Sequence, residues 1–151
     1  KPTNYERCNI RDILLYVVHL MESYATQYRA KCHLQVDGNL PAINGDDKQL
    51  KQVLLNIIKN GIESMPEGGE IHIRAYQKTQ GHLCISVEDQ GFGIENEKLE
   101  KIGKAFYTTK ETGTGLGLMI TYKIIKEHQG SITIQSSVGV GTKVEIFLPT
   151  F

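Results

Sequence analysis

The sequence has few of the features that mark a disulfide-rich, zinc-binding or membrane-spanning protein. It holds three cysteines, Cys8, Cys32 and Cys84, and no two of them form a C-x-x-C pair. This predicts neither a disulfide framework nor a zinc site, and it favours a reducing compartment. The longest apolar run, 13–18, is far shorter than the roughly 20 residues that a membrane-spanning helix needs. The expected location is therefore the cytoplasm.

An excess of charge of one sign is also missing. Seventeen Lys and Arg residues balance seventeen Asp and Glu residues, so the formal net charge is zero. Nucleic-acid binders usually carry a basic excess, so we expect no nucleic-acid partner. The 151 residues suffice for one domain, predicted over 1–151. The chain has no initiator Met and no signal-peptide pattern, so we expect a piece of a longer parent that could carry membrane segments.

Apolar residues at helical spacing predict helices over 10–28 and 46–64. A third helix, predicted over 116–128, is nearly apolar throughout and is expected to be buried. Alternating apolar residues predict strands, and the last two form a hairpin. The predicted strands are 32–36, 70–76, 82–88, 131–136 and 142–148.

These elements predict an α/β two-layer sandwich. A mixed, mostly antiparallel sheet of about five main strands would be covered on one face by three helices. The segment of about 90–115 is rich in glycine and lysine and has no sustained periodicity. Loops of this length inside a compact domain are uncommon unless they bind a ligand, so we predict a lid or binding loop there.

Two asparagines in the second helix need an explanation beyond folding. Asn56 and Asn60 lie one turn apart, off the apolar stripe and on the same strip as Glu63. A solvated polar face is the ordinary explanation. Asparagine is a poor helix former, however, and two of them cost stability without structural gain. The pair therefore indicates a functional role.

Two glycine-rich segments stand at element boundaries. Asp89-Gln90-Gly91-Phe92-Gly93-Ile94 follows a strand directly, and its glycines allow a sharp turn and a close approach of the backbone to a ligand. Taken alone, an ordinary turn explains it equally well. Gly113-Thr114-Gly115-Leu116-Gly117-Leu118 opens the last helix, where backbone amides and the helix dipole suit a phosphate. Glycines there also permit close helix packing.

Other nucleotide-binding patterns are absent from the sequence. A Rossmann loop needs G-x-G-x-x-G after an apolar strand, whereas this string is G-x-G-x-G and follows the polar segment 107–112. The sequence contains no G-x-x-x-x-G-K-[ST], which excludes a P-loop. The motif set of eukaryotic-type protein kinases is missing as well.

Taken in order, the motifs resemble the ATP-binding catalytic domain of bacterial sensor histidine kinases, in the superfamily that includes gyrase, the Hsp90 chaperones and MutL. The order is the asparagine pair, the 89–94 segment, Phe-Tyr-Thr-Thr-Lys at 106–110, and the 113–118 segment. The resemblance covers roughly 9–149, and the stretch 58–65 is most similar to the nitrogen-regulator and sporulation-kinase branch. It implies Mg²⁺-ATP binding and transfer of the γ-phosphoryl group to a histidine, within a two-component system or phosphorelay.

The resemblance also assigns roles to residues. Asn60 would bind Mg²⁺, and Asn56 would line the same wall on the phosphate side; these two are the catalytic candidates. Asp89 would accept a hydrogen bond from the adenine amine, which selects ATP over GTP, and Thr142 would support Asp89 through water. Ser64 stands where several relatives carry an aromatic residue, so stacking on the base does not carry over to this side. The other implied nucleotide-binding residues are Lys59, Glu63, Gly91, Gly93, Ile94, Phe106 (the lid anchor), Lys110, Gly113, Thr114, Gly115, Leu116, Gly117 and Leu118.

The residue at position 56 predicts transfer rather than hydrolysis. Gyrase-type ATPases carry E-x-x-x-N in this helix, and their Glu activates water, whereas the amide of Asn56 cannot accept a proton. None of the five histidines lies in the acceptor string of such kinases, and His19 falls on a packed helix. We therefore expect an upstream dimeric helical domain of the parent to carry the acceptor, with a response regulator downstream. The isolated domain should be a monomer without direct membrane contact.

Two other functions remain open from the sequence. An anti-sigma-factor-type serine kinase shares the fold, but its relatives generally carry an acidic residue in place of Asn56. A degenerate nucleotide-binding or partner-docking module is the alternative without enzymatic activity, although the intact glycine motifs weigh against it. Measuring ATP affinity with and without Mg²⁺ would test the docking module, which a Mg²⁺-independent or undetectable affinity would favour.

Overall fold

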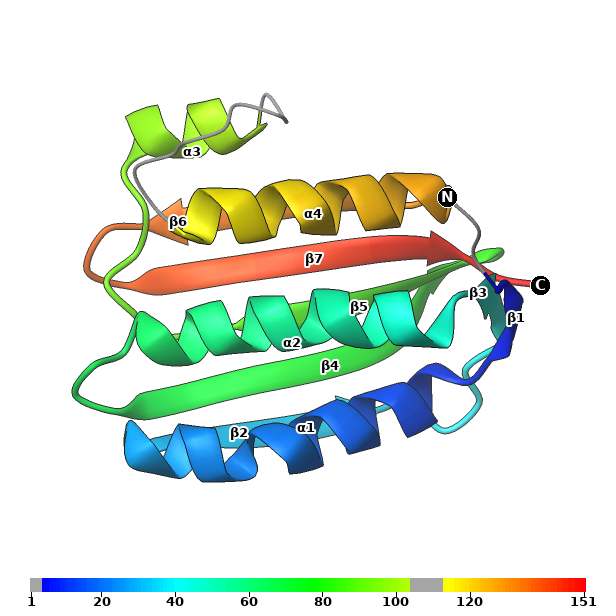
Figure 1. Cartoon of the computed structure of the whole chain (residues 1–151), viewed down its shortest axis with the longest axis horizontal. Helices are drawn as coiled ribbons and strands as arrows, with labels where there is room; N and C mark the ends of the chain where they lie inside the picture. Colours follow the sequence, from blue (N-terminus) through cyan, green and yellow to red (C-terminus); the bar gives the residue numbers. More distant parts are fainter. Residues whose placement is uncertain (1–3, 104–112) are drawn as a thin grey trace.

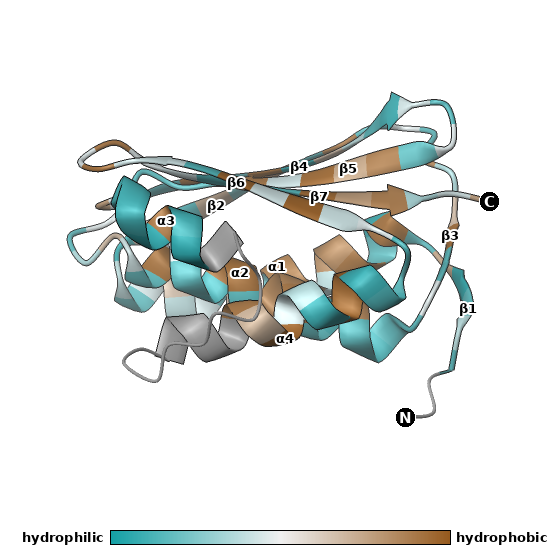
Figure 2. Cartoon of the chain, turned by 90° about the horizontal axis from the view of Figure 1, so that it is seen from above, coloured by the Kyte–Doolittle hydropathy of each residue, from teal (hydrophilic) through white to brown (hydrophobic). Residues whose placement is uncertain are grey.

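The computed structural model describes residues 4–103 and 113–151. Helices α1, α2 and α4 lie side by side along one face of a sheet (Figure 1), and the view from above shows them on the same side of it (Figure 2). The elements in chain order are β1 (Glu6–Cys8), α1 (Ile10–Gln27), β2 (Ala30–Val36), β3 (Ile43–Gly45), α2 (Asp47–Glu63), β4 (Gly69–Thr79), β5 (His82–Glu88), α3 (Asn96–Gly103), α4 (Gly113–Glu127), β6 (Ser131–Ser137) and β7 (Gly141–Pro149).

The main sheet has five strands in the order β2-β4-β5-β7-β6. Strands β2 and β4 pair in parallel, and the other neighbours pair antiparallel. This confirms the predicted two-layer α/β sandwich with a mixed, mostly antiparallel sheet covered on one face by helices.

Helix α2 forms the centre of the helical layer. Asp46 caps its start, because the side chain accepts hydrogen bonds from the amides of Lys48 and Gln49. Its apolar stripe packs against the inner face of the sheet, which includes Ile71 and Ile73 of β4, and its polar edge carries the asparagine pair. In the described parts of the chain, no helix is both long and apolar enough to cross a bilayer. The buried positions of α2 are Leu50, Val53, Leu54, Ile57, Ile58, Gly61 and Ile62.

The structure corrects the sequence-based expectations at three places. Helix α3 falls inside the segment expected to lack regular structure; it has eight residues, so its two apolar residues at helical spacing, Leu99 and Ile102, are too few for a sustained periodicity. Strands β1 and β3 form a separate antiparallel pair, and each is too short for an alternating pattern. Helix α4 begins at Gly113, three residues early, and buries only one face, because Lys123 and Lys126 are exposed.

Candidate functional site

A cavity of about 300 Å³ lies among the second half of α2, the loop after β5 and the inner side of β6 and β7. Predicted site residues from four separate parts of the chain meet in its wall. The fold therefore assembles much of the site that the sequence motifs indicated. The predicted residues that line the cavity are Asn60, Glu63, Asp89, Gly93, Ile94, Leu118 and Thr142.

The backbone fixes the carboxylate of Asp89, which follows the last residue of β5. Its Oδ1 accepts hydrogen bonds from the amides of Gly91, at 2.8 Å, and Thr142, at 3.1 Å. The amide of Asp89 in turn donates to the carbonyl of Thr142 at 2.9 Å. Oδ2 faces Gly61, which lines the cavity, because a Cβ on that glycine would lie 3.4 Å away from it. One carboxylate oxygen thus holds the loop while the other is directed toward the cavity.

Burial raises the pKa of Asp89 above the ordinary value for a carboxyl group. The amides of Gly91 and Thr142, and then the hydroxyl of Ser64, act in the opposite direction, while the charge of Glu88 adds to the increase. The desolvation therefore outweighs the hydrogen bonds. A partly desolvated carboxylate in a cavity is a group that a hydrogen-bond donor on a ligand would stabilise.

Thr142 supports Asp89 directly through its backbone, while the water-mediated support stays a prediction. Its backbone amide bonds the carboxylate directly, whereas its hydroxyl pairs with the hydroxyl of Ser136 at 2.8 Å. Ser136 also accepts a hydrogen bond from the amide of Ile94 at 2.8 Å. The hairpin β6–β7 therefore holds both ends of the 89–94 segment.

The two glycines of this segment are required by close contacts within the protein. A Cβ on Gly91 would lie 1.9 Å from Ser64 Oγ, and Gly91 is buried there rather than lining the cavity. Gly93 has φ +79°, and a Cβ would lie 2.2 Å from the carbonyl oxygen of Ser137. The sharp turn is thus as predicted, and within the protein Gly91 closely approaches Ser64, which follows the end of α2.

The polar edge of α2 divides between cavity and solvent. Asn60 is half-buried and lines the cavity, whereas Asn56, one turn earlier, does not. Lys59 also lies outside the wall; its side chain is 55% exposed and its Nζ lies 3.9 Å from Glu63 Oε2. The carboxylate of Glu63 is further bonded by the hydroxyl of Tyr24 on α1. Asn60 and Glu63 both line the cavity, but the carboxylate of Glu63 already has partners in Lys59 and Tyr24, whereas no ion pair involves Asn60 in the described part of the chain.

Part of the predicted site falls outside the described residues. Phe106 and Lys110 belong to the segment 104–112. The glycine-rich segment from Gly113 forms the first turns of α4, as its position at a helix start predicted, while the side chains of Thr114 and Leu116 are not described. Leu118, which closes that segment, is buried and lines the cavity.

Several lining residues were not predicted. Gly61 carried a usable signal, because an isolated glycine inside an otherwise strong helix often marks a close approach. Ile134 and Val144 are register partners across β6 and β7, and their alternating pattern indicated an inward face but not a site. The lining residues that sequence reasoning missed are Ile57, Gly61, Ser64, Phe92, Ile134 and Val144.

Comparison with known sequences gives matches over most of the chain. The family model described as histidine kinase-, DNA gyrase B-, and HSP90-like ATPase matches residues 45–151. Sporulation kinase C of Bacillus subtilis (strain 168) is 48% identical over 143 residues, which is 93% of this chain and 33% of that protein. Sporulation kinase E of the same organism is 43% identical over 145 residues, which is 96% of this chain and 20% of that protein. The chain therefore spans a fifth to a third of the length of these relatives.

Solved structures agree with the sequence matches. Full-length ShkA in complex with AMPPNP superposes with a TM-score of 0.86 at 26% identity, over 99% of this chain and 32% of that one. The nucleotide-free catalytic domain of histidine kinase ThkA superposes with a TM-score of 0.84 at 31% identity, over 98% of this chain and 99% of that one. With its sandwich fold and motif-lined cavity, the chain belongs to the histidine kinase-, DNA gyrase B- and HSP90-like ATPase family and corresponds to the catalytic domain of histidine kinases.

Proposed function

We propose that this chain binds ATP with Mg²⁺ in the cavity beside α2 and transfers the γ-phosphoryl group to a histidine on a separate dimeric helical domain of its parent protein. The observation that carries the proposal is the carboxylate of Asp89. It is fixed by two backbone amides at the wall of a cavity whose other sides are largely apolar. The apolar lining side chains are those of Ile57, Phe92, Ile94, Leu118, Ile134 and Val144.

This arrangement suits an adenine ring. The exocyclic amine of adenine donates a hydrogen bond that Asp89 can accept, and the apolar walls can cover the faces of the ring. Guanine carries a carbonyl oxygen at that position, and a carboxylate would repel it. The site should therefore select ATP over GTP through Asp89.

The residues on the phosphate side fit a Mg²⁺ ion that arrives with a nucleotide. Mg²⁺ prefers oxygen ligands and takes few of them from the protein, with phosphate oxygens and water supplying the rest. The half-buried amide of Asn60 offers one such oxygen at the cavity wall. When bound, the ion would neutralise charge on the phosphates. The start of α4 at Gly113 offers backbone amides and the positive end of the helix dipole to the phosphate tail.

Phosphoryl transfer asks the protein mainly for positioning and charge neutralisation. Asn56 has an amide where a hydrolase would need a general base, so water is poorly activated and a protein histidine is the favoured acceptor. His19 lies on α1, which is packed, yet its own side chain is 86% exposed and borders Glu22. It does not line the cavity. The acceptor is therefore expected on the parent's helical domain, with a response regulator receiving the phosphoryl group.

The test uses Asn60 variants with radiolabelled ATP, Mg²⁺ and the parent's upstream helical domain. We expect Asn60→Ala and Asn60→Asp to lower acid-labile labelling of that domain by about 100-fold or more, the scale of losing one group that stabilises developing charge. Circular dichroism should show an unchanged fold. Asn39→Ala, at an exposed turn away from the cavity, is the matched control and should label normally. Full labelling by the Asn60 variants would refute the metal assignment, and Mg²⁺-independent binding without transfer would favour a docking module.

A further inference from the structure

The face of the sheet that the helices leave open carries two histidines and a glutamate close together. Strands β2 and β4 pair in parallel with His33 opposite His72. Because Ile71 and Ile73 point into the core, Glu70 and His72 project from the other face of β4. His33 Nε2 contacts a carboxylate oxygen of Glu70, and the two imidazole rings stack with centroids 4.8 Å apart and an interplanar angle of 14°.

The chemistry of this cluster is that of a transition-metal site. One ligand atom from each of the three side chains lies within 4.8 Å of the other two. Imidazole nitrogens and carboxylate oxygens bind Zn²⁺ at about 2.0–2.2 Å, so the three donors need only small side-chain rotations to share one ion. We propose that His33, Glu70 and His72 form a binding site for a divalent transition-metal ion, with Zn²⁺ as the reference case, separate from the nucleotide cavity.

Folding alone gives little reason for this cluster. The side chains of His33 and Glu70 are 39% and 45% exposed, and an ion pair so open to water contributes little to stability. The side chain of Glu70 contacts His33, although the residue opposite Glu70 on strand β2 is Lys31. The amide of Glu70 is held by Gln90 Oε1 at 2.9 Å, which fixes the start of β4. The donors thus stand on two hydrogen-bonded strands, and rigid placement of this kind favours metal binding.

The surroundings favour a cation. Glu88 is the register partner of His72 on β5 and brings a second carboxylate to the same face. Lys143, opposite Glu88 on β7, has its Nζ 3.8 Å from Glu145 Oε2 and is therefore partly neutralised by that residue. His72, Glu88 and Lys143 line a hollow of about 480 Å³, whose far end reaches Asp89 and Thr142 at the wall of the nucleotide cavity. Because His72 borders this hollow, an ion held by the three donors would keep a position open for water or another ligand.

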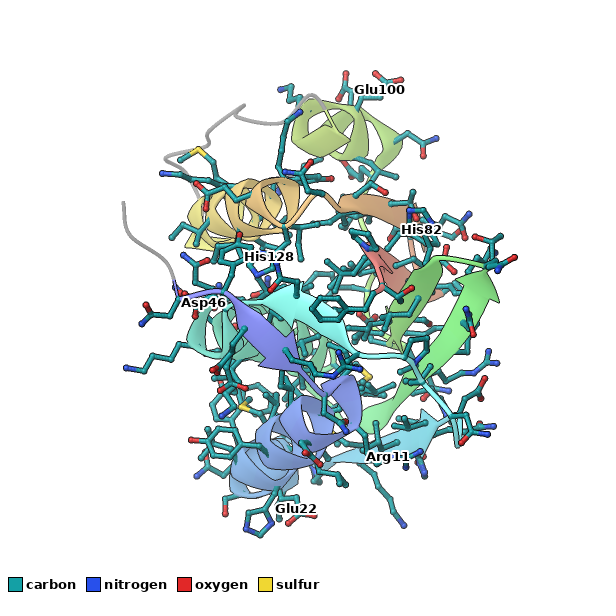
Figure 3. The ribbon with its side chains drawn as sticks, turned by 90° about the vertical axis from the view of Figure 1, so that its right-hand side faces the viewer. Arg11, Glu22, Asp46, His82, Glu100 and His128 are labelled. Atoms are coloured by element: carbon teal, nitrogen blue, oxygen red, sulfur yellow. The ribbon has the colours of Figure 1, made fainter. Side chains whose placement is uncertain are left out.

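The test is calorimetric titration of Zn²⁺ into the nucleotide-free chain, with Co²⁺ absorption in the visible range as a second readout of coordination. We expect one Zn²⁺ per chain. His33→Ala, His72→Ala and Glu70→Gln should each weaken Zn²⁺ binding by at least about 10- to 100-fold. Removing a residue that only hydrogen-bonds to a metal ligand already costs that much affinity, and these substitutions remove the ligands themselves. His82→Ala, an exposed histidine at the start of β5 (Figure 3), should bind normally. Cys32→Ser should also bind normally, because Cys32 pairs with the inward-facing Ile71.

The outcomes separate this site from the nucleotide site. The three variants should keep wild-type affinity for Mg²⁺-ADP, because none of the three residues lines the nucleotide cavity. Absent Zn²⁺ binding would overturn the proposal, as would binding that survives all three substitutions or is lost equally in His82→Ala. Thermal unfolding of each variant shows whether lost binding reflects a lost fold. For a variant that remains folded, the visible absorption of added Co²⁺ shows whether the metal is still coordinated. Failure of the Asn60 experiment would leave these expectations unchanged.

Discussion

The backbone of Gly91 packs directly against the side chain of Ser64, so that a Cβ on Gly91 would lie 1.9 Å from Ser64 Oγ. The amide of Phe92 also donates to the carbonyl of Ser64 at 3.1 Å, which joins the loop after β5 to the end of α2. Gly91→Ala must push these segments apart. We expect it to lower the free energy of unfolding by roughly 1–3 kcal/mol, as overpacking does. We expect ADP affinity, measured by calorimetry, to fall about tenfold or more, which corresponds to roughly 1.4 kcal/mol or more.

The matched control for this substitution is Gly38→Ala. A Cβ on Gly38 meets no atom within 4 Å, so both stability and ADP affinity should stay close to those of the wild type. Unchanged ADP affinity in Gly91→Ala would show that the placement of this loop does not determine nucleotide binding.

Asp89→Asn should separate stability from binding. The amide keeps an oxygen that can accept from Gly91 and Thr142, so the loop stays in place. It removes a charge whose burial raises the pKa of Asp89. A raised folded-state pKa means that the associated stability is present at low pH and is lost as the pH rises through that pKa. At pH 7 we therefore expect Asp89→Asn to unfold at a higher temperature than the wild type, and to lose selective binding of ADP over GDP.

Two measurements check this separation. The gain in melting temperature should shrink as the pH falls through the raised pKa of Asp89 and should be gone below about 4, where carboxyl groups of the unfolded chain are protonated as well. Asp37→Asn, an exposed position outside the cavity, should change neither quantity. If Asp89→Asn instead melted at a lower temperature than the wild type at pH 7, the hydrogen bonds from the backbone amides of Gly91 and Thr142 to the charged carboxylate would outweigh the cost of burying its charge.

The fold could be predicted from the sequence where the patterns are long and regular. The apolar stripe of helix α2 runs from Leu50 to Ile62, and the structure has the helix within one residue of the predicted bounds. Asp46 caps its start. The site was indicated because Asn60 and Asp89 disturb strong local patterns, an amide in a helix and a carboxylate at the end of a strand. Residues that break a local rule in this way often belong to functional sites.

The rest depends on register and packing, which the sequence does not show. Support of Asp89 by the amide of Thr142 requires the β5–β7 pairing across more than fifty residues. The pairing of His33 with His72 requires the parallel register of β2 and β4. Helix α3 escaped prediction because its apolar residues Leu99 and Ile102, although spaced as in a helix, span only one turn.

Asn56→Glu tests why a transferase should hydrolyse ATP slowly. The substitution places a carboxylate one helical turn before Asn60, as in the E-x-x-x-N string of gyrase-type ATPases. A general base contributes about 10²- to 10⁴-fold when well placed, so a gain of about tenfold in ATP hydrolysis by the isolated chain is a cautious expectation. Asn56→Gln adds the same length without a base and should show no gain. Equal rates in the two variants would mean that position 56 does not reach the attacking water.

Asp46→Ala tests how the start of α2 is held. Asp46 Oδ1 accepts from the amides of Lys48, at 3.0 Å, and Gln49, at 3.2 Å. The amide of Asp46 donates to His128 Nε2 at 3.0 Å, and His128 Nδ1 lies 2.8 Å from the carbonyl of Ile124, so the proton of this imidazole sits on Nδ1 (Figure 3). The alanine variant keeps that backbone bond but loses the cap and the hydrogen bond that Asp46 Oδ2 accepts from the amide of Asn4 at 3.3 Å. We expect urea unfolding to show a loss of about 0.5–2 kcal/mol.

Asp46→Asn distinguishes the cap from the charge. Its oxygen can still accept from the amides of Lys48 and Gln49, so the variant loses the attraction between the carboxylate and the helix dipole, about 0.3–1 kcal/mol at low salt, and the hydrogen bond that Oδ2 accepts from the amide of Asn4 at 3.3 Å. The asparagine variant should therefore stay more stable than Asp46→Ala, and the electrostatic part of its deficit should vanish in added salt, which screens the dipole. If the two variants were equally destabilised and both recovered in salt, the hydrogen bonds at Oδ1 would contribute nothing, and the start of α2 would be held by charge alone.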